Sequence, residues 1–349
     1  MLFDRLAFCC SKHTSSSQRK YPTVIEELCH QFSLANLKKS TNNFDENGVI
    51  GYGRFGKVYK GCLQHNDGSD YSVTLKRLGV KDSRGLEQFK NEIELLCQLR
   101  HPNCVSLIGF CNHKKEKILV YEYMSNGSLH QHLRGGLLSW KKRLEICIEA
   151  AHGLHYLHTG AKRTIIHRNI NPSNILLDNN MKSKLTDFRL SIQGPRYGSK
   201  PKPIKVYVIE GSLGYMPMEY IVDGTITDKF DVFSFGMVLL EVVCGRNCLI
   251  IPTETEVLEK PVEENIDQNI KGKIAPECWQ VFIDIIIRCL KYEPDERPTM
   301  GEVEVQLEHA LSMQEQADIT NTNSDYTLFS TTTIHLGLEL ESNPEESDT

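Results

Sequence analysis

Hydrophobic and polar positions divide this chain into a strand-rich first part and a helical second part. Residues 49–61 and 71–78 are apolar segments with high strand propensity, and the dipeptide Asp67-Gly68 between them indicates a turn. Residues 84–99 carry apolar side chains every three or four positions, which predicts a helix. Residues 118–123 form another short apolar segment, where we expect a buried strand.

The pattern becomes helical after Asn126-Gly127. Two helices are predicted at 232–243 and 281–290, and an earlier one has an apolar face that recurs at helical spacing. That face consists of Leu144, Ile148, Ala151 and Leu154. A small sheet-rich lobe followed by a larger helical lobe is typical of an α+β fold.

We divide the chain into four regions. Residues 1–31 are polar, rich in Ser and without a period, so we expect a flexible leader. Residues 32–124 form the sheet-rich lobe, which opens with a short helix whose N-cap candidate is Ser33. Residues 125–311 form the helical lobe. Residues 312–349 are rich in Thr, Asn, Ser and acidic side chains, so we expect a disordered acidic tail.

Composition narrows the class of protein. The 349 residues carry a formal net charge of -5, and Lys and Arg are spread along the chain, so we expect no nucleic acid partner. The richest apolar runs are too short to cross a bilayer and indicate buried helices. The 12 cysteines show no C-x-x-C spacing, which argues against a cysteine zinc site, and without a secretory signal we expect reduced thiols.

One cysteine pair differs from the rest in its surroundings. Cys9 and Cys10 follow apolar residues and precede Lys12, Arg19 and Lys20, a context that suits dual S-acylation. Acylation would place the protein at the cytoplasmic face of the plasma membrane. The alternative is a pair of solvent-exposed thiols in a flexible leader and a protein of the cytosol.

A glycine-rich loop is the first candidate for chemistry. Residues 51–58 have a G-x-G-x-x-G-x-V pattern, with Gly51, Gly53 and Gly56 as its glycines. Glycines let the backbone lie close to phosphates and donate N–H groups to anionic oxygens. The pattern is also compatible with a hairpin that merely needs glycine. A dinucleotide-binding loop fits poorly, because a strand rather than a helix follows.

Polar residues farther along the chain strengthen the phosphate hypothesis. Lys76 lies on a predicted strand and Glu92 on the next helix, an arrangement in which the lysine holds phosphates and the glutamate holds the lysine. The triplet His167-Arg168-Asn169 is followed by Asn174 and, 13 residues later, by Asp187. The last two side chains offer oxygen ligands of the kind that Mg²⁺ prefers.

These ordered motifs resemble those of the eukaryotic protein kinase family across about residues 44–311. Segments 40–44, 211–215 and 231–236 resemble plant receptor-like kinases, and segment 144–158 is similar to the Pto and FERONIA-like group of receptor-like cytoplasmic kinases. The resemblance implies a bilobal protein kinase fold that binds ATP or ADP.

The resemblance also implies roles for individual residues. Residues 122–124 would form the hinge for the adenine, with Tyr121 in the gatekeeper position, and Glu219 would form a structural ion pair with Arg297. The implied nucleotide-binding set is Ile50, Gly51, Gly53, Gly56, Val58, Lys76, Glu92, Tyr121, Glu122 and Met124.

Histidines at short spacing raise the alternative of a metal site. His152, His155 and His158 recur on one predicted helix, and His130 and His132 lie close together nearby. Their place in the helices of the family favours a structural role for all of them.

The catalytic loop departs from the family at two positions, although Arg168 is retained. Asn169 replaces the aspartate that accepts the substrate proton, and the loss of a general base costs about 10²–10⁴-fold in rate. Its carbonyl can still accept a hydrogen bond from a hydroxyl. Asn171 replaces a lysine that would neutralise charge on the γ-phosphoryl group, and such electrostatic stabilisation is commonly the largest catalytic contribution.

Two further departures lie in the metal and docking loops. Arg189 replaces the glycine of the family's Asp-Phe-Gly, which restricts the backbone and brings a cation close to Asp187. That cation has two open roles: it pairs with Asp187 and competes with Mg²⁺, or it reaches a phosphate. We therefore expect weakened Mg²⁺ binding. In the segment 216–218 the proline is displaced from the family's position, which affects the substrate-docking loop.

These observations lead to one hypothesis and two alternatives. We expect a receptor-like cytoplasmic pseudokinase that keeps ATP affinity and acts through contacts with receptor kinases or immune receptors. The first alternative is a weakly active serine/threonine kinase in which Asn169 only positions the hydroxyl. The second is a scaffold whose nucleotide site is closed by Arg189.

Overall fold

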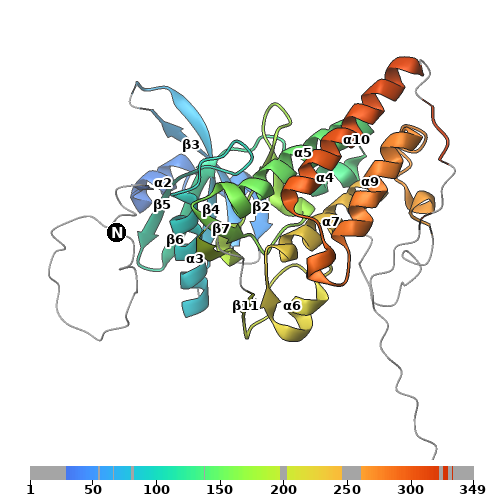
Figure 1. Cartoon of the computed structure of the whole chain (residues 1–349). Helices are drawn as coiled ribbons and strands as arrows, with labels where there is room; N and C mark the ends of the chain where they lie inside the picture. The colour runs from blue at the N-terminus through green and yellow to red at the C-terminus, as the bar shows by residue number, and fades with distance from the viewer. Residues whose placement is uncertain are drawn as a thin grey trace, which may run out of the picture.

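A six-stranded sheet forms the core of the first lobe (Figure 1). Its strand order in this computed structural model is β1-β5-β6-β4-β3-β2, and all neighbours are antiparallel except the parallel pair of β1 and β5. The strands are β1 (His30–Gln31), β2 (Val49–Gly53), β3 (Gly56–Gln64), β4 (Asp70–Leu78), β5 (Leu107–His113) and β6 (Glu116–Glu122). The structure describes residues 29–53, 56–65, 67–79, 82–136, 138–196, 203–245, 261–321, 325–328 and 332.

The sequence pattern predicted most of this lobe correctly. The apolar segment at 49–61 divides into β2 and β3 at the glycine-rich loop, and the segments at 71–78 and 118–123 match β4 and β6 within two residues. Asp67-Gly68 lies in the turn before β4, where the Gly68 amide donates to the His65 carbonyl at 3.0 Å. The short helix is α2 (Leu34–Ser40), and Ser33 caps it by accepting from the Asn36 amide at 3.1 Å.

Helix α3 (Ser83–Leu96) connects this sheet to the main hydrophobic core. Asp82 caps its first turn by accepting from the Gly85 amide at 2.8 Å. Phe89, Ile93 and Leu96 recur at helical spacing and are buried against that core. Gln88 and Glu92 are buried beside this apolar face, and Glu92 reaches the candidate site.

The second lobe is helical, as expected, and the bilobal α+β arrangement is confirmed. Its helices are α4 (Leu129–Gly135), α5 (Trp140–His155), α6 (Met218–Asp223), α7 (Lys229–Cys244), α9 (Pro276–Cys289) and α10 (Met300–Thr320). Helix α7 is buried along nearly its whole length, and α10 packs beside α5 and α9 (Figure 1). Among the described residues, no helix is both long enough and apolar enough to cross a membrane.

Three short two-stranded sheets complete this lobe and carry its loops. Strand β10 (Ile192–Arg196) pairs with β7 (Arg163–Ile166), and β11 (Ile204–Lys205) pairs with β12 (Thr225–Ile226). The third sheet pairs β8 (Ile175–Leu177) with β9 (Ser183–Leu185). The cysteines of the described residues form no disulfide with one another.

The boundary predicted for the acidic tail is wrong. The tail was placed at 312–349, but α10 continues to Thr320. Gln314 is buried and its carbonyl accepts from the Ala275 amide at 2.9 Å, and Tyr326 donates its hydroxyl to Asp318 at 2.8 Å. The Tyr326 amide also donates to the Gly272 carbonyl at 2.8 Å. The contacts with Ala275 and Gly272 come from a distant part of the chain and hold the segment on the lobe. The leader with Cys9 and Cys10 lies outside the described residues and stays a prediction.

The ion pair implied between Glu219 and Arg297 is present. Arg297 is 2% exposed, and its two terminal nitrogens lie 2.6 Å and 2.9 Å from the two carboxylate oxygens of Glu219. The guanidinium also donates to the carbonyls of Lys291, Lys229 and Tyr292. One buried cation thus connects α6 to the start of α7 and to the loop after α9.

We expect Arg297→Ala to destabilise the protein by about 3–5 kcal/mol, because it leaves a partly buried carboxylate and several carbonyls without their donor. The matched control is Arg288→Ala, which removes an exposed pair with Asp284 at 3.9 Å and should cost about 0.5 kcal/mol or less. Urea unfolding of the two variants measures the difference. Equal losses would contradict a structural role for the buried pair.

Candidate nucleotide site

A buried carboxylate on α7 holds the loop that carries Asn169. Asp231 is fully buried, and its two oxygens accept from the backbone amides of His167 at 2.6 Å and Arg168 at 2.8 Å. His158 lies 3.0 Å from the same carboxylate, so the structural role predicted for this histidine is confirmed. Arg168 adopts a left-handed backbone conformation with φ of 65°, which these bonds support.

The Arg168 side chain connects this loop to the segments that follow the predicted metal residue. One terminal nitrogen donates to the Leu190 carbonyl at 3.0 Å, and the other donates to the Tyr220 hydroxyl at 2.8 Å. Tyr220 belongs to α6, so the buried Arg168 guanidinium connects its own loop to the segment after Asp187 and to α6. In this structure Arg168 therefore positions these three segments relative to one another.

Lys76, Glu92 and Asp187 come together between the two lobes. The Lys76 ammonium on β4 lies 3.2 Å from Glu92 on α3 and 2.7 Å from Asp187. Burial works to lower the pKa of Lys76, but the two carboxylates more than offset burial, and the pKa is raised. The lysine is therefore a firmly protonated cation. The sequence placed these three residues in one site, and the structure brings them into contact.

Both oxygens of Asp187 already accept hydrogen bonds from protein donors. Oδ1 accepts from Lys76, and Oδ2 accepts from the Asn169 amide nitrogen at 2.6 Å and from Arg189 Nε at 3.1 Å. Burial works to raise the pKa of Asp187, but Lys76 and Arg189 outweigh it and hold the pKa well below the ordinary range. Of the two roles left open for Arg189, the structure shows the pairing with Asp187.

The orientation of the Asn169 amide follows from its two partners. Its nitrogen donates to Asp187, and its carbonyl oxygen accepts from the Ser212 hydroxyl at 2.8 Å. The Asn171 amide donates to the Ser212 hydroxyl and to the Asn169 backbone carbonyl, both at 3.1 Å. The Asn174 side-chain amide also donates to the Asn169 backbone carbonyl, at 2.7 Å. The side chains of Asp187, Ser212, Asn171 and Asn174 therefore hold the loop around Asn169.

An aspartate at position 169 would not fit this arrangement. It has no proton to donate at neutral pH, and it would bring one carboxylate within 2.6 Å of another. Asn169 and Arg189 therefore act on the same carboxylate, one through a neutral donor and one through a charge. Two departures that look separate in the sequence form one structural unit.

The described donor set does not fit Mg²⁺. The oxygen types of Asn174 and Asp187 suit the ion, as the sequence predicted. However, both Asp187 oxygens are engaged, and two of their three donors are the cations Lys76 and Arg189. A metal would have to displace these donors and approach two positive charges. The structure thus gives a physical basis for the expected weakening by Arg189.

The glycine-rich loop and the predicted hinge lie on the strands beside this cluster. Gly51 and Gly53 belong to β2, and Gly56 opens β3, where a Cβ atom would lie 1.9 Å from the Arg77 carbonyl of β4. Gly56 is therefore required for strand packing. Residues 54–55 at the tip lie outside the described residues. Val58 pairs with Lys76 in the sheet register, and Ile50 is half exposed on β2.

The residues predicted as gatekeeper and hinge lie at the end of β6 and just after it. Tyr121 is 5% exposed, and its hydroxyl has no hydrogen-bond partner among the described residues. Burial raises the pKa of this phenol, and the nearby Glu92 carboxylate raises it further. The Glu122 carboxylate accepts from the Ser106 amide at 2.7 Å and from Lys184 at 2.8 Å, which fixes the strand end before the buried Met124.

Sequence reasoning missed two contributors to the site. Ser212 lies in the segment 211–215, which served only as a family marker, yet its hydroxyl contacts Asn169. Asn91 on α3 donates to the Arg189 carbonyl at 3.2 Å and to the Ser191 carbonyl at 2.8 Å. Its position next to Glu92, on the polar side of α3, was the available signal.

Comparisons with known proteins identify the family of this chain. A family model described as protein tyrosine and serine/threonine kinase matches residues 44–307. Over 305 residues the chain is 47% identical to the receptor-like protein kinase ANXUR2 of Arabidopsis thaliana, covering 83% of this chain and 35% of the relative. Over 322 residues it is 42% identical to the receptor-like protein kinase FERONIA of the same plant, covering 88% and 35%.

The chain thus spans about a third of the length of these curated relatives. The family model covers well over half of the chain, and the glycine loop, lysine, catalytic loop and Asp187 follow one another in the family's order. The chain therefore belongs to the eukaryotic protein kinase family, in its plant receptor-like kinase group.

Proposed function

We propose that this protein is a receptor-like cytoplasmic pseudokinase that binds ATP or ADP and signals through protein contacts. The observation that carries the proposal is that both carboxylate oxygens of Asp187 already accept hydrogen bonds from protein donors. In an active kinase this aspartate holds Mg²⁺ against the phosphates, and a second aspartate orients the substrate hydroxyl. Here the first is neutralised by protein groups and the second is replaced by an amide.

The direction of the Asn169 amide supports the loss of transfer. The carbonyl that could accept a hydrogen bond from a substrate hydroxyl already accepts one from Ser212 at 2.8 Å. Asn171 adds no charge where a γ-phosphoryl group would need it. The weakly active alternative requires Ser212 to release Asn169 and Mg²⁺ to displace Arg189.

The charge balance of the cluster formed by Lys76, Glu92, Asp187 and Arg189 supports nucleotide binding without a metal ion. Lys76 and Arg189 provide two positive charges, and Glu92 and Asp187 provide two negative charges, so the cluster is neutral. A phosphate chain can take Lys76 from Asp187, because Arg189 and Asn169 still compensate that carboxylate. The metal's usual neutralising role is thereby partly supplied by Arg189.

The partners and the location extend the proposal beyond the site. The similar proteins are named as receptor-like protein kinases, and we propose receptor kinases or immune receptors as partners of this chain. We further propose attachment to the cytoplasmic face of the plasma membrane through acylated Cys9 and Cys10, with the cytosol as the alternative. Their context of apolar and basic neighbours supports this location.

Nucleotide binding should appear as a thermal shift. ATP or ADP at a hundred times its Kd stabilises the folded state by about 2.7 kcal/mol through mass action. We expect nearly the same shift in EDTA as in Mg²⁺, because Lys76, Asn169 and Arg189 already compensate the charge of Asp187, a predicted metal ligand. Lys76→Met should abolish the shift. If folded protein shows no shift at millimolar nucleotide, the closed scaffold replaces the pseudokinase.

Phosphate transfer should be absent in the wild type and recoverable by reversion. We expect little or no autophosphorylation of the wild type with ATP and Mg²⁺. The triple variant Asn169→Asp, Asn171→Lys, Arg189→Gly should transfer at least about 10²-fold more phosphate than the wild type. Asn169→Asp alone should recover only part, since these residues act on one transition state. Robust wild-type transfer that Lys76→Met removes would identify a working kinase. An inert but nucleotide-binding triple variant would place the defect in segment 216–218.

Asn169→Asp should also destabilise the nucleotide-free protein by about 1–3 kcal/mol, because a donor to Asp187 becomes a second carboxylate. Repulsion raises the pKa of one member of the pair, so the folded variant binds an extra proton. The deficit relative to wild type should therefore grow as pH rises from about 4.5 to about 7. Urea unfolding measures it, with exposed Asn112→Asp as control. A deficit independent of pH would contradict the carboxylate contact.

A further inference from the structure

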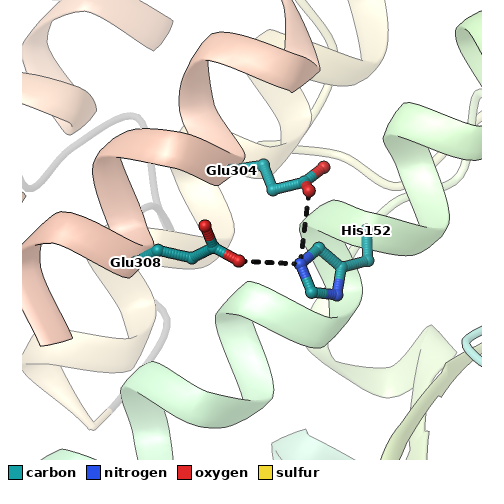
Figure 2. A group of neighbouring side chains, drawn as sticks. All are labelled: His152, Glu304 and Glu308. Atoms are coloured by element: carbon teal, nitrogen blue, oxygen red, sulfur yellow. Dashed lines mark hydrogen bonds and ion pairs between the residues drawn. The ribbon is translucent and has the colours of Figure 1, made fainter.

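A cluster of histidine and glutamate side chains joins α5 to α10 on the second lobe (Figure 2). His152 of α5 points at Glu304 and Glu308 of α10, and its Nε2 atom lies 3.3 Å from Glu304 Oε1 and 3.3 Å from Glu308 Oε1. The three donor atoms all lie within 4.8 Å of one another. None of these residues takes part in the nucleotide site.

The spacing of the donor atoms suits a small tetrahedral cation. Zinc ligands at 2.0–2.1 Å in tetrahedral geometry place two donor atoms about 3.3 Å apart, as His152 stands to each glutamate. The same distance is long for an N–H···O hydrogen bond, which is commonly about 2.9–3.0 Å. The 3.3 Å hydrogen bond of Nε2 with Glu308 and its 3.3 Å contact with Glu304 make one edge of the imidazole face both carboxylates, as the ligands of one shared cation do.

A fourth residue holds Glu304 in this orientation. His155 Nδ1 lies 2.7 Å from Glu304 Oε2, the oxygen that faces away from His152. The His155 ring fits there because position 301 is glycine, where a Cβ atom would lie 3.0 Å from its Nε2 atom. Carboxylates that bind metals are usually held by such a second hydrogen bond.

The electrostatic environment also favours a cation. In the part of the chain that the structure describes, the ion pairs of Glu304 and Glu308 are with histidines alone. Two carboxylates thus converge without a lysine or arginine between them. The His152 side chain is 34% exposed and that of Glu308 is 54% exposed, which leaves a path for an ion and room for a water ligand.

We propose that His152, Glu304 and Glu308 form a zinc site, with His155 as the residue that positions Glu304. An imidazole nitrogen with two carboxylate oxygens suits Zn²⁺, whereas Mg²⁺ and Ca²⁺ prefer oxygen ligands alone. A water molecule completes four ligands. The bound ion links α5 to α10 and so ties the last helix of the lobe to the helix beneath it.

The test is a titration of metal-free, untagged full-length protein with ZnCl₂ by calorimetry and thermal unfolding. We expect one equivalent to bind with a Kd of about micromolar order and to raise the Tm by mass action. MgCl₂ should give neither effect. Co²⁺ should show the visible absorption of a tetrahedral site.

Variants assign the ligands. His152→Ala and Glu308→Gln should each weaken Zn²⁺ binding at least tenfold, and His155→Ala should weaken it about 10–100-fold as a positioning residue does. The control His309→Ala changes an exposed neighbour on α10 and should leave the affinity unchanged. Equal Zn²⁺ binding by wild type, His152→Ala and Glu308→Gln would overturn the proposal, as would the absence of binding by folded wild type.

Discussion

A carboxylate removed from water needs hydrogen-bond donors, and two aspartates, Asp231 fully buried and Asp187 partly buried, organise this protein through that requirement. Asp231 meets it with the backbone amides of the catalytic loop, so the loop can adopt only one path. Asp187 meets it with Lys76, Asn169 and Arg189, which come from three separate segments. The contact between the lobes at Lys76 and Asp187, and the hydrogen bonding of the loop around Asn169, both depend on how these two charges are compensated.

The second aspartate explains why the catalytic departures belong together. Replacing a carboxylate by an amide at position 169 removes a repulsion next to Asp187 and adds a hydrogen bond. Arg189 then adds a charge to the same oxygen. Each change makes the metal less necessary for the folded state. This shared compensation of Asp187 is the physical basis of the proposed nucleotide binding without phosphate transfer.

Local pattern predicted most of the fold because strands and helices of this protein keep clear apolar periodicity. The apolar, strand-prone segment at 71–78 and the helical spacing at 84–99 needed no distant partner to be recognised. The tail boundary failed for the opposite reason. Residues after 312 look polar along the chain, but Gln314 and Tyr326 find partners at Ala275 and Gly272, which sequence spacing does not reveal.

The sequence by itself determined the family, the order of its motifs and the chemical identity of the groups at each position, because an amide at 169 cannot accept a proton in any fold. Only the tertiary structure decided which partners those groups meet. It brought Arg189 to Asp187, and it set His152 against Glu304 and Glu308. Charges and hydrogen bonds act over a few ångströms in space, so residues far apart in the chain acquire a role only when packing brings them together.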